Sequence, residues 1–201
     1  VSTIDDICWT LNIRGNDIDF FPLVLSYGII TMYSFELYID EKKLDDKLKA
    51  KLEKDGVNLH PYNDIYEDVK KFGSDVVAMI DPGKLNYALF NNIPENVKTV
   101  EKRNPAILMK AIKNPVEIEN IRKAQIKDSV AHVRFMKWLK ENVGKMRITE
   151  MSASDKLDEF RAEMGNFIRP SFEPISSFGE HGAIVHYTSS PETDVELKEG
   201  Q

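Results

Sequence analysis

The spacing of apolar positions predicts an α/β unit in residues 1–105. Short runs rich in β-branched and aromatic side chains predict strands, and from Leu44 a helical period appears between them. Leu44, Leu48 and Leu52 recur every four residues, and Gly56 follows at the position of a helix-ending glycine. The predicted strands are 7–13, 23–30, 32–39, 57–60 and 75–80, and further helices are predicted at 62–72 and 84–91. This order predicts a mixed sheet covered by helices.

Residues 106–201 have a different pattern, which predicts two helices followed by short strands. The first helix is long and apolar on two sides, which predicts a position between layers. The alternating residues 171–187 predict the strands. The helix boundaries are marked by the capping and helix-ending residues Asn114, Pro115, Gly144, Thr149 and Gly165. We therefore expect α/β followed by α+β, with domains 1–105 and 106–201.

Composition excludes several classes of function. The chain has 201 residues with 33 acidic and 27 basic side chains, a net charge of −6, so it has no basic surface for nucleic acid or a membrane. Its longest apolar stretches, such as 22–30, are far shorter than the roughly 20 residues that cross a bilayer. Cys8 is the single cysteine, which excludes an internal disulfide and predicts a cytoplasmic protein. The chain starts without Met and stops at a turn-like Glu-Gly, so we expect an internal fragment of a longer polypeptide.

The four histidines are the first candidates for chemistry, although none lies in a metal-binding or phosphate-binding motif. His60, at the end of a strand, is expected at the surface, and His132 is expected to pack within the long helix. His181 and His186 are an odd number of residues apart, so in one straight strand they would point in opposite directions, which disfavours a shared metal. From spacing alone, an ordinary hairpin with solvated histidines stays open.

The residues 171–187, SFEPISSFGEHGAIVHY, resemble the entry strands of the pita-bread metallopeptidases of family M24. Further stretches narrow the resemblance to the three-domain Xaa-Pro aminopeptidases, also called aminopeptidase P. These stretches are DDICWTLNIRGND at 5–17, AIKN at 111–114, IKDSVA at 126–131, WL at 138–139 and TEMSA at 149–153. The resemblance covers nearly the whole chain.

The resemblance implies a fold and an activity. Residues 1–105 would form a ribonuclease-H-like, creatinase N-terminal-like mixed-sheet domain, and 106–201 the first part of a pita-bread catalytic domain. The family removes an N-terminal residue that precedes proline, with two divalent ions, usually manganese, and the parent protein would be a homodimer. The family's metal ligands, two Asp, one His and two Glu, have no counterparts in this chain, so the fragment itself is expected to bind no metal and to be inactive.

The resemblance also implies roles for individual residues. His186 corresponds to the catalytic histidine that hydrogen-bonds the substrate near the scissile bond, and an imidazole can change its charge near neutral pH. Phe172 corresponds to an aromatic residue on the proline side of the substrate pocket, with a plain core aromatic as the alternative. At position 181 many relatives carry Asn, so the role of His181 stays open between a turn residue and a ligand contact.

Three charged residues are expected to be structural. Arg14 and Asp17 belong to a turn and are interpreted as an ion-pair and turn element, with substrate contact as a minority alternative. Asp128 lies on an apolar stripe and would need a hydrogen-bonding partner if buried. Two other functions compete with the peptidase: a metal-free pita-bread module that binds peptides without cutting them, and a prolidase or creatinase, which the features around residues 12–15 disfavour.

Overall fold

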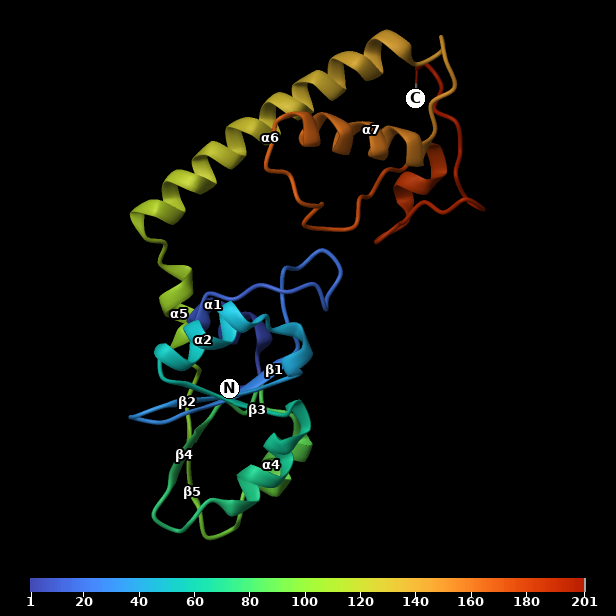
Figure 1. Cartoon of the computed structure of the whole chain (residues 1–201). Helices are drawn as coiled ribbons and strands as arrows, with labels where there is room; N and C mark the ends of the chain where they lie inside the picture. The colour runs from blue at the N-terminus through green and yellow to red at the C-terminus, as the bar shows by residue number, and fades with distance from the viewer. Residues whose placement is uncertain (201) are drawn as a thin grey trace. The chain divides into compact units, whose positions relative to one another are not determined.

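The computed structural model describes residues 1–200 and divides into two compact units, Val1–Lys113 and the residues from Asn114 onward. Figure 1 shows the elements of both units. The strands are β1 (Ser26–Ile30), β2 (Phe35–Ile39), β3 (Val57–His60), β4 (Val77–Ile80) and β5 (Lys98–Glu101). The α-helices are α1 (Ile4–Leu11), α2 (Asp46–Lys54), α3 (Ile65–Asp68), α4 (Tyr87–Asn92), α5 (Ala106–Ala111), α6 (Pro115–Asn142) and α7 (Glu150–Glu163). Short 3-10 helices are Glu41–Lys43, Tyr62–Asp64, Val69–Lys71 and Gly179–Ala183. No helix within residues 1–200 is both long and apolar enough to span a membrane.

The first unit contains the mixed sheet that the sequence predicts. β2 lies in the middle of a three-stranded sheet, antiparallel to β1 and parallel to β3. Leu37 of β2 aligns with Gly28 on one side and with Leu59 on the other. β4 and β5 form a separate parallel pair. The prediction of a mixed α/β unit is confirmed.

Helices cover both faces of the three-stranded sheet. On one face, Leu37 and Ile39 of β2 pack with Ile7 of α1 and Leu52 of α2, all nearly inaccessible to solvent. On the other face, Tyr38 packs with residues of α3 and α4. Figure 1 shows α1 and α2 on one side of the sheet and α4 on the other. The alternation along β2 therefore places the core on both sides of the central strand.

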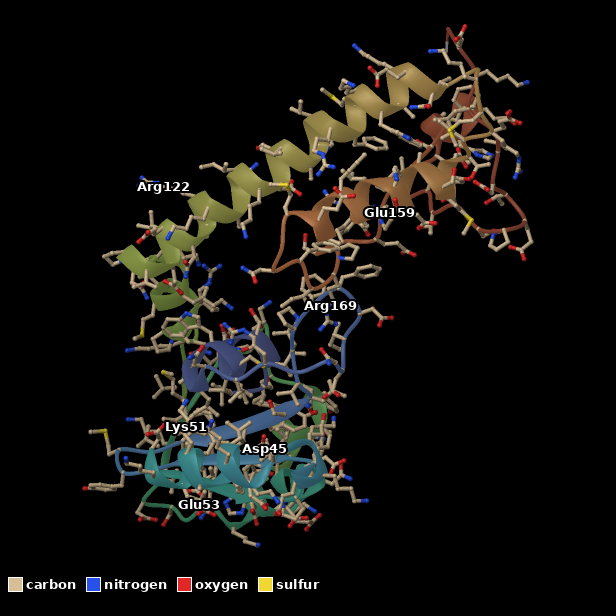
Figure 2. The ribbon with its side chains drawn as sticks, turned by 45° about the horizontal axis from the view of Figure 1, so that its top comes forward. Asp45, Lys51, Glu53, Arg122, Glu159 and Arg169 are labelled. Carbon is tan, nitrogen blue, oxygen red and sulfur yellow. The ribbon has the colours of Figure 1, made fainter. Side chains whose placement is uncertain are left out.

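Helix α2 follows the predicted four-residue period. The side chain of Asp45 caps the helix by accepting a hydrogen bond from the backbone N–H of Leu48, at 2.7 Å. Gly56 follows with φ of +82°, the left-handed conformation that a helix-ending glycine supplies. Asp45, Lys51 and Glu53 occupy its solvent-exposed positions, as Figure 2 shows.

The strand predicted at 7–13 is wrong, because these residues belong mostly to helix α1. Ile4, Ile7, Cys8 and Leu11 have the spacing of one helical face, and Ile7 and Cys8 are buried. Asp5 and Asp6 lie in the first turn, where their negative charges interact favourably with the positive end of the helix dipole. Asn12 ends the helix in a left-handed conformation, with φ of 50°. The β-branched and aromatic composition of the segment was thus a weaker signal than its period.

The second unit is built on the helices α6 and α7, whose N-termini the sequence predicts. Asn114 and Thr149 each form a reciprocal capping box with the third residue of the helix. The two helices run antiparallel. Asp128 of α6 pairs with Arg161 of α7, and Nζ of Lys156, earlier in α7, lies over the ring of Trp138, later in α6. The sequence predicts that α6 lies between two layers. Within residues 1–200 its second apolar side is not covered, since Ile126 on that side is 66% exposed.

The strands predicted at 171–187 are also wrong. This part of the structure contains the 3-10 helix Gly179–Ala183 and turns. The backbone N–H groups of His181, Ile184 and Tyr187 donate to carbonyl groups three residues earlier, as in Ile184 to His181 at 3.1 Å, and that of Phe178 donates to a side chain. Residues without a partner strand cannot form a ladder, whatever their alternation. Within residues 1–200, the antiparallel contact in this unit is an isolated bridge between Thr149 and Glu196.

Candidate functional site

A fully buried carboxylate organises the candidate site. Glu150 is the first residue of α7 and has no solvent-exposed surface. Its Oε1 accepts a hydrogen bond from the backbone N–H of Phe178 at 2.5 Å, and its Oε2 accepts one from the hydroxyl of Tyr187 at 2.6 Å. Nδ1 of His181 lies 3.0 Å from Oε1. Because a carboxylate can only accept, Nδ1 of His181 carries the proton of that bond.

The donors around Glu150 determine its charge. Burial alone would favour the neutral acid, but the hydrogen bonds from Tyr187, the Phe178 amide and His181 outweigh burial and lower the pKa of Glu150. The N-terminal position in α7 adds the favourable end of the helix dipole. Glu150 is therefore an anion at neutral pH, held by three donors from the segment 178–187.

Tyr187 is attached to Glu150 through its hydroxyl and to His181 through its ring. Its side chain is buried, and its ring stacks on His181 with 4.6 Å between ring centroids. Burial and the bond to the Glu150 carboxylate both raise the pKa of Tyr187, because each disfavours the phenolate. The hydroxyl therefore keeps its proton, and can donate it to Glu150, at neutral pH.

The start of α7 is itself fixed by the last described residues. The backbone N–H of Glu150 donates to the carbonyl of Val195 at 3.1 Å, and the N–H of Leu197 donates to the carbonyl of Ile148 at 2.8 Å. The N–H of Met151 donates to the side chain of Asp194 at 3.0 Å. The N–H groups of Glu150 and Met151, which have no partner within their own helix, are thus satisfied. The backbone around Glu150 is therefore held by hydrogen bonds to residues 194–197.

His186 lies next to this anchored tyrosine. Its side chain is exposed, and its backbone has φ of 58°. This left-handed conformation is uncommon for residues other than glycine and costs roughly 1–2 kcal/mol. A residue remains in it when the surrounding structure fixes the chain on either side. Here Tyr187 is fixed by Glu150, and the imidazole of His186 is exposed to solvent.

The other residues of the segment are placed differently. Phe172 is 60% exposed, so it does not belong to the core that the described residues form. His181, whose role the sequence left open, contacts Glu150 and Tyr187 and so holds the segment. The structure therefore brings His181 and Tyr187 together at Glu150, while His186 and Phe172 lie at the surface.

The charged residues of the first unit have structural contacts. Arg14 donates to the carbonyls of Cys8 and Ile13, at 3.2 and 2.8 Å. Asp17 pairs with Lys43 at 2.6 Å, and this bond lowers the pKa of the Asp17 carboxyl. Both residues therefore have structural contacts, but Asp17 pairs with Lys43 and Arg14 bonds to backbone carbonyl groups, so the contacts found are not an ion pair of Arg14 with Asp17.

Asp128, His60 and His132 also show no contact that indicates a catalytic role among the described residues. Asp128 accepts a hydrogen bond from Nε of Arg161 at 2.8 Å, as expected of a structural carboxylate. His60 lies 2.6 Å from the carboxylate of Glu36 and is partly exposed, whereas His132 is exposed on α6.

The residues present do not fit a metal pair. Within residues 1–200, no group of three or more His, Cys, Asp or Glu side chains gathers in a way that could hold a metal ion. The carboxylate of Glu150 is turned inward and saturated by donors.

The sequence analysis missed Glu150 and Tyr187 as parts of the site. Thr149 signals a helix start, and an acidic residue right after such a cap is ordinary. Tyr187 reads as the end of a strand. The available signal was the combination of an acidic first helical residue with two potential donors, His181 and Tyr187, in one glycine-containing segment.

Comparison with known proteins assigns both units. Residues 1–117 match the creatinase/prolidase N-terminal domain, and residues 119–201 match metallopeptidase family M24. Xaa-Pro aminopeptidase 1 of Dictyostelium discoideum is 37% identical over 204 residues, covering 100% of this chain and 32% of the relative. A probable Xaa-Pro aminopeptidase P of Neurospora crassa is 36% identical over 198 residues, covering 93% of this chain and 29% of the relative.

Two solved structures of proline-specific peptidases are similar to this chain. An X-prolyl aminopeptidase of Caenorhabditis elegans, described as a cytosolic enzyme with a di-nuclear active site, superposes with a TM-score of 0.88 at 30% identity, covering 97% of this chain and 33% of that chain. A Xaa-Pro dipeptidase of Bacillus anthracis shares the fold, with a TM-score of 0.53 at 15% identity over 81% of this chain and 43% of that one. The chain thus spans about a third of the length of the aminopeptidases it matches. With an α/β unit of the creatinase type followed by a partial pita-bread domain, the chain belongs to the Xaa-Pro aminopeptidase P family of M24 metallopeptidases.

Proposed function

We propose that the protein containing this chain removes an N-terminal residue that precedes proline. The support is the order of the two matched domains and the identity of 36–37% to relatives named as Xaa-Pro aminopeptidases. Within this proposal, residues 1–105 act as the middle domain and 106–201 as the beginning of the catalytic domain. The substrates are peptides with proline at the second position.

His186 is the proposed catalytic residue of this segment. Its exposed imidazole on a left-handed backbone, next to an anchored tyrosine, is the observation that carries the assignment. An imidazole can donate a hydrogen bond to the carbonyl oxygen of a scissile bond and can take part in proton transfer near neutral pH. Phe172 is proposed to line the proline side of the substrate, since its exposed ring is available for an apolar contact.

Two divalent ions, proposed to be manganese, would supply an activated water in the whole enzyme. The Caenorhabditis relative, described as having a di-nuclear active site, supports a pair of ions. Because residues 1–200 gather no set of ligands for them, we propose that the ligands come from another part of the longer protein. The 201-residue chain alone is then inactive. The cytoplasm is the proposed setting, supported by the description of that relative as cytosolic and by the single buried Cys8. A homodimer is the proposed assembly, on the resemblance to the family alone.

The test is hydrolysis by the longer protein. Release of the first residue from an Xaa-Pro-Xaa peptide, dependent on added manganese, is the expected result. His186→Ala should lower kcat strongly and leave the metal content unchanged, and His132→Ala, on the exposed side of α6, serves as the matched control.

Two outcomes contradict the proposal. If the His186→Ala variant loses metal in proportion to activity, His186 is not a substrate contact. If the longer protein binds a proline-containing peptide and never cleaves it with any divalent ion, the metal-free peptide-binding module is the correct function. Hydrolysis by the 201-residue chain alone would refute the proposal that the metal ligands come from another part of the longer protein.

A further inference from the structure

We propose that Glu150 is a positioning residue, which fixes the backbone of His186 through Tyr187. The inference rests on the proposed function for the role of His186, but its structural part can be tested without activity. Glu150 would never touch substrate, since its side chain is completely buried. It would act by holding the segment that carries the imidazole.

The first argument is the number and origin of the donors. Both carboxylate oxygens of Glu150 are used, and all of their side-chain and amide donors come from Phe178, His181 and Tyr187. The segment 178–187 contains no strand, so these bonds replace a sheet ladder as its attachment. Charge-assisted hydrogen bonds of this kind are roughly twice as strong as neutral ones.

The second argument is the strain next to the attachment. His186 is in the left-handed region, and its neighbour Tyr187 is buried with its hydroxyl 2.6 Å from Glu150. Without that anchor, the chain next to His186 would be held less firmly, and His186 would relax to a conformation with ordinary φ. The imidazole would then leave the position in which it meets the substrate.

The choice of variants follows from the geometry. Glu150→Gln keeps the shape but replaces one accepting oxygen with an NH₂ group, which faces a donor of the segment. Tyr187→Phe removes one hydroxyl and keeps the stack on His181, so it tests the same link with little risk to the fold. Glu159→Gln is the matched control, because Glu159 lies on the same helix, as Figure 2 shows, and bonds to Lys156, a residue outside the segment.

The first measurement uses the 201-residue chain. Amide hydrogen exchange detected by NMR should show protection of the Phe178 N–H in the parent chain and in Glu159→Gln. Protection should fall in Glu150→Gln, together with the ring contact between His181 and Tyr187. Unchanged protection in Glu150→Gln would overturn the proposal. If Glu150→Gln does not fold, Tyr187→Phe decides: exchange protection of the amide at position 187, which donates to the carbonyl of Ile184, should fall in this variant, and unchanged protection there would overturn the proposal.

The second measurement uses the longer, active protein. Glu150→Gln and Tyr187→Phe should each lower kcat by roughly 10- to 100-fold, because a small displacement of a catalytic group has effects of this size. In a His186→Ala background the same changes should lower kcat no further, since there is no imidazole left to position.

A full additional loss in the His186→Ala background would overturn the role through His186. If the parent enzyme shows no hydrolysis, the proposed function fails, while the exchange data still decide whether Glu150 holds the segment. A loss of kcat in Glu159→Gln equal to that in Glu150→Gln would also refute the proposal, because any change on α7 would then have the same effect.

Discussion

Lys110 should hold the beginning of the first unit to its end. Its Nζ lies 2.5 Å from Oδ1 of Asp6, and it also bonds to Asp5, so α5 is tied to α1. The side chain of Asp6 is 2% exposed and that of Lys110 is 23% exposed. Lys110→Met keeps the apolar stem of the side chain and removes only the cation, which leaves a buried carboxylate with less compensation.

The size of the effect follows from what remains around Asp6. Removing one partner of a fully buried pair costs about 3–5 kcal/mol. Asp6 keeps hydrogen bonds from Thr3 at 2.5 Å and from Asn104 at 2.8 Å, and Lys110 is partly solvated. We therefore expect Lys110→Met to lower the free energy of unfolding by about 2 kcal/mol. In Asp6→Asn/Lys110→Met the two losses should not add, with a coupling of roughly 1 kcal/mol or more.

Urea unfolding can isolate this unit, because the sequence has two tryptophans, Trp9 in the first unit and Trp138 in the second. In a Trp138→Phe background, fluorescence then reports the first unit alone. Lys51→Met is the control, since Lys51 is exposed on α2 without a described ion pair, and it should be within about 0.5 kcal/mol of the parent. An unchanged midpoint for Lys110→Met, or full additivity in the double variant, would refute the reasoning.

The same pair gives a pH dependence. Burial opposes ionisation of Asp6, but the bonds from Lys110, Thr3 and Asn104 outweigh it and lower the pKa of Asp6. Because the pKa of Asp6 is lower in the folded than in the unfolded state, ionised Asp6 stabilises the fold above the unfolded pKa of about 4. This stabilisation is lost as the pH falls through the pKa of the folded state. The parent chain should therefore lose more stability on acidification below about pH 4 than Asp6→Asn does. Equal acid sensitivity would contradict this.

Three further predictions concern single positions. Gly28→Ala should cost about 1–3 kcal/mol in urea unfolding, because its Cβ would lie 2.6 Å from the buried ring of Phe35, whereas Gly83→Ala, with an ordinary contact at 3.6 Å, should be nearly neutral. Asn114→Ala should lower the thermal stability measured by far-UV circular dichroism by about 1 kcal/mol through loss of the α6 cap, and a gain would contradict the capping box. His186→Gly should be about 1 kcal/mol more stable than His186→Ala in the same urea assay, since glycine adopts positive φ without strain, and equal stabilities would argue against a left-handed residue there.

Much of the fold could be predicted from local signals. The period of Leu48 and Leu52 and the glycine at position 56 give α2, and Asn114-Pro115 gives the first turn of α6. The strand 57–60 appears with the predicted bounds. These elements depend on neighbours close in the sequence, which is why their residues alone specify them.

The wrong predictions have two causes. In one segment the composition disagreed with the apolar period, and in the other the structure depends on partners distant in the sequence. Residues 4–11 contain β-branched and aromatic side chains, but their apolar period is helical, and the sheet offers them a face to cover. The segment 171–187 alternates as a strand does, yet strand formation depends on a partner that no local signal reveals. The same holds for the candidate site. The role of Glu150 depends on hydrogen-bond donors that are distant in the sequence and meet it only in the folded chain.

The position of Glu150 also has a kinetic consequence. Its donors are 28, 31 and 37 residues later in the chain, so each bond requires closure of a loop of that length. Helix α7 can form within microseconds from contacts between near neighbours, whereas long closures have a higher entropic cost and come later. Residues 178–187 should therefore become ordered after helix α7 has formed during refolding, and should be released before it unfolds under mild denaturant. Limited proteolysis should cut the chain there before it cuts α6 or α7.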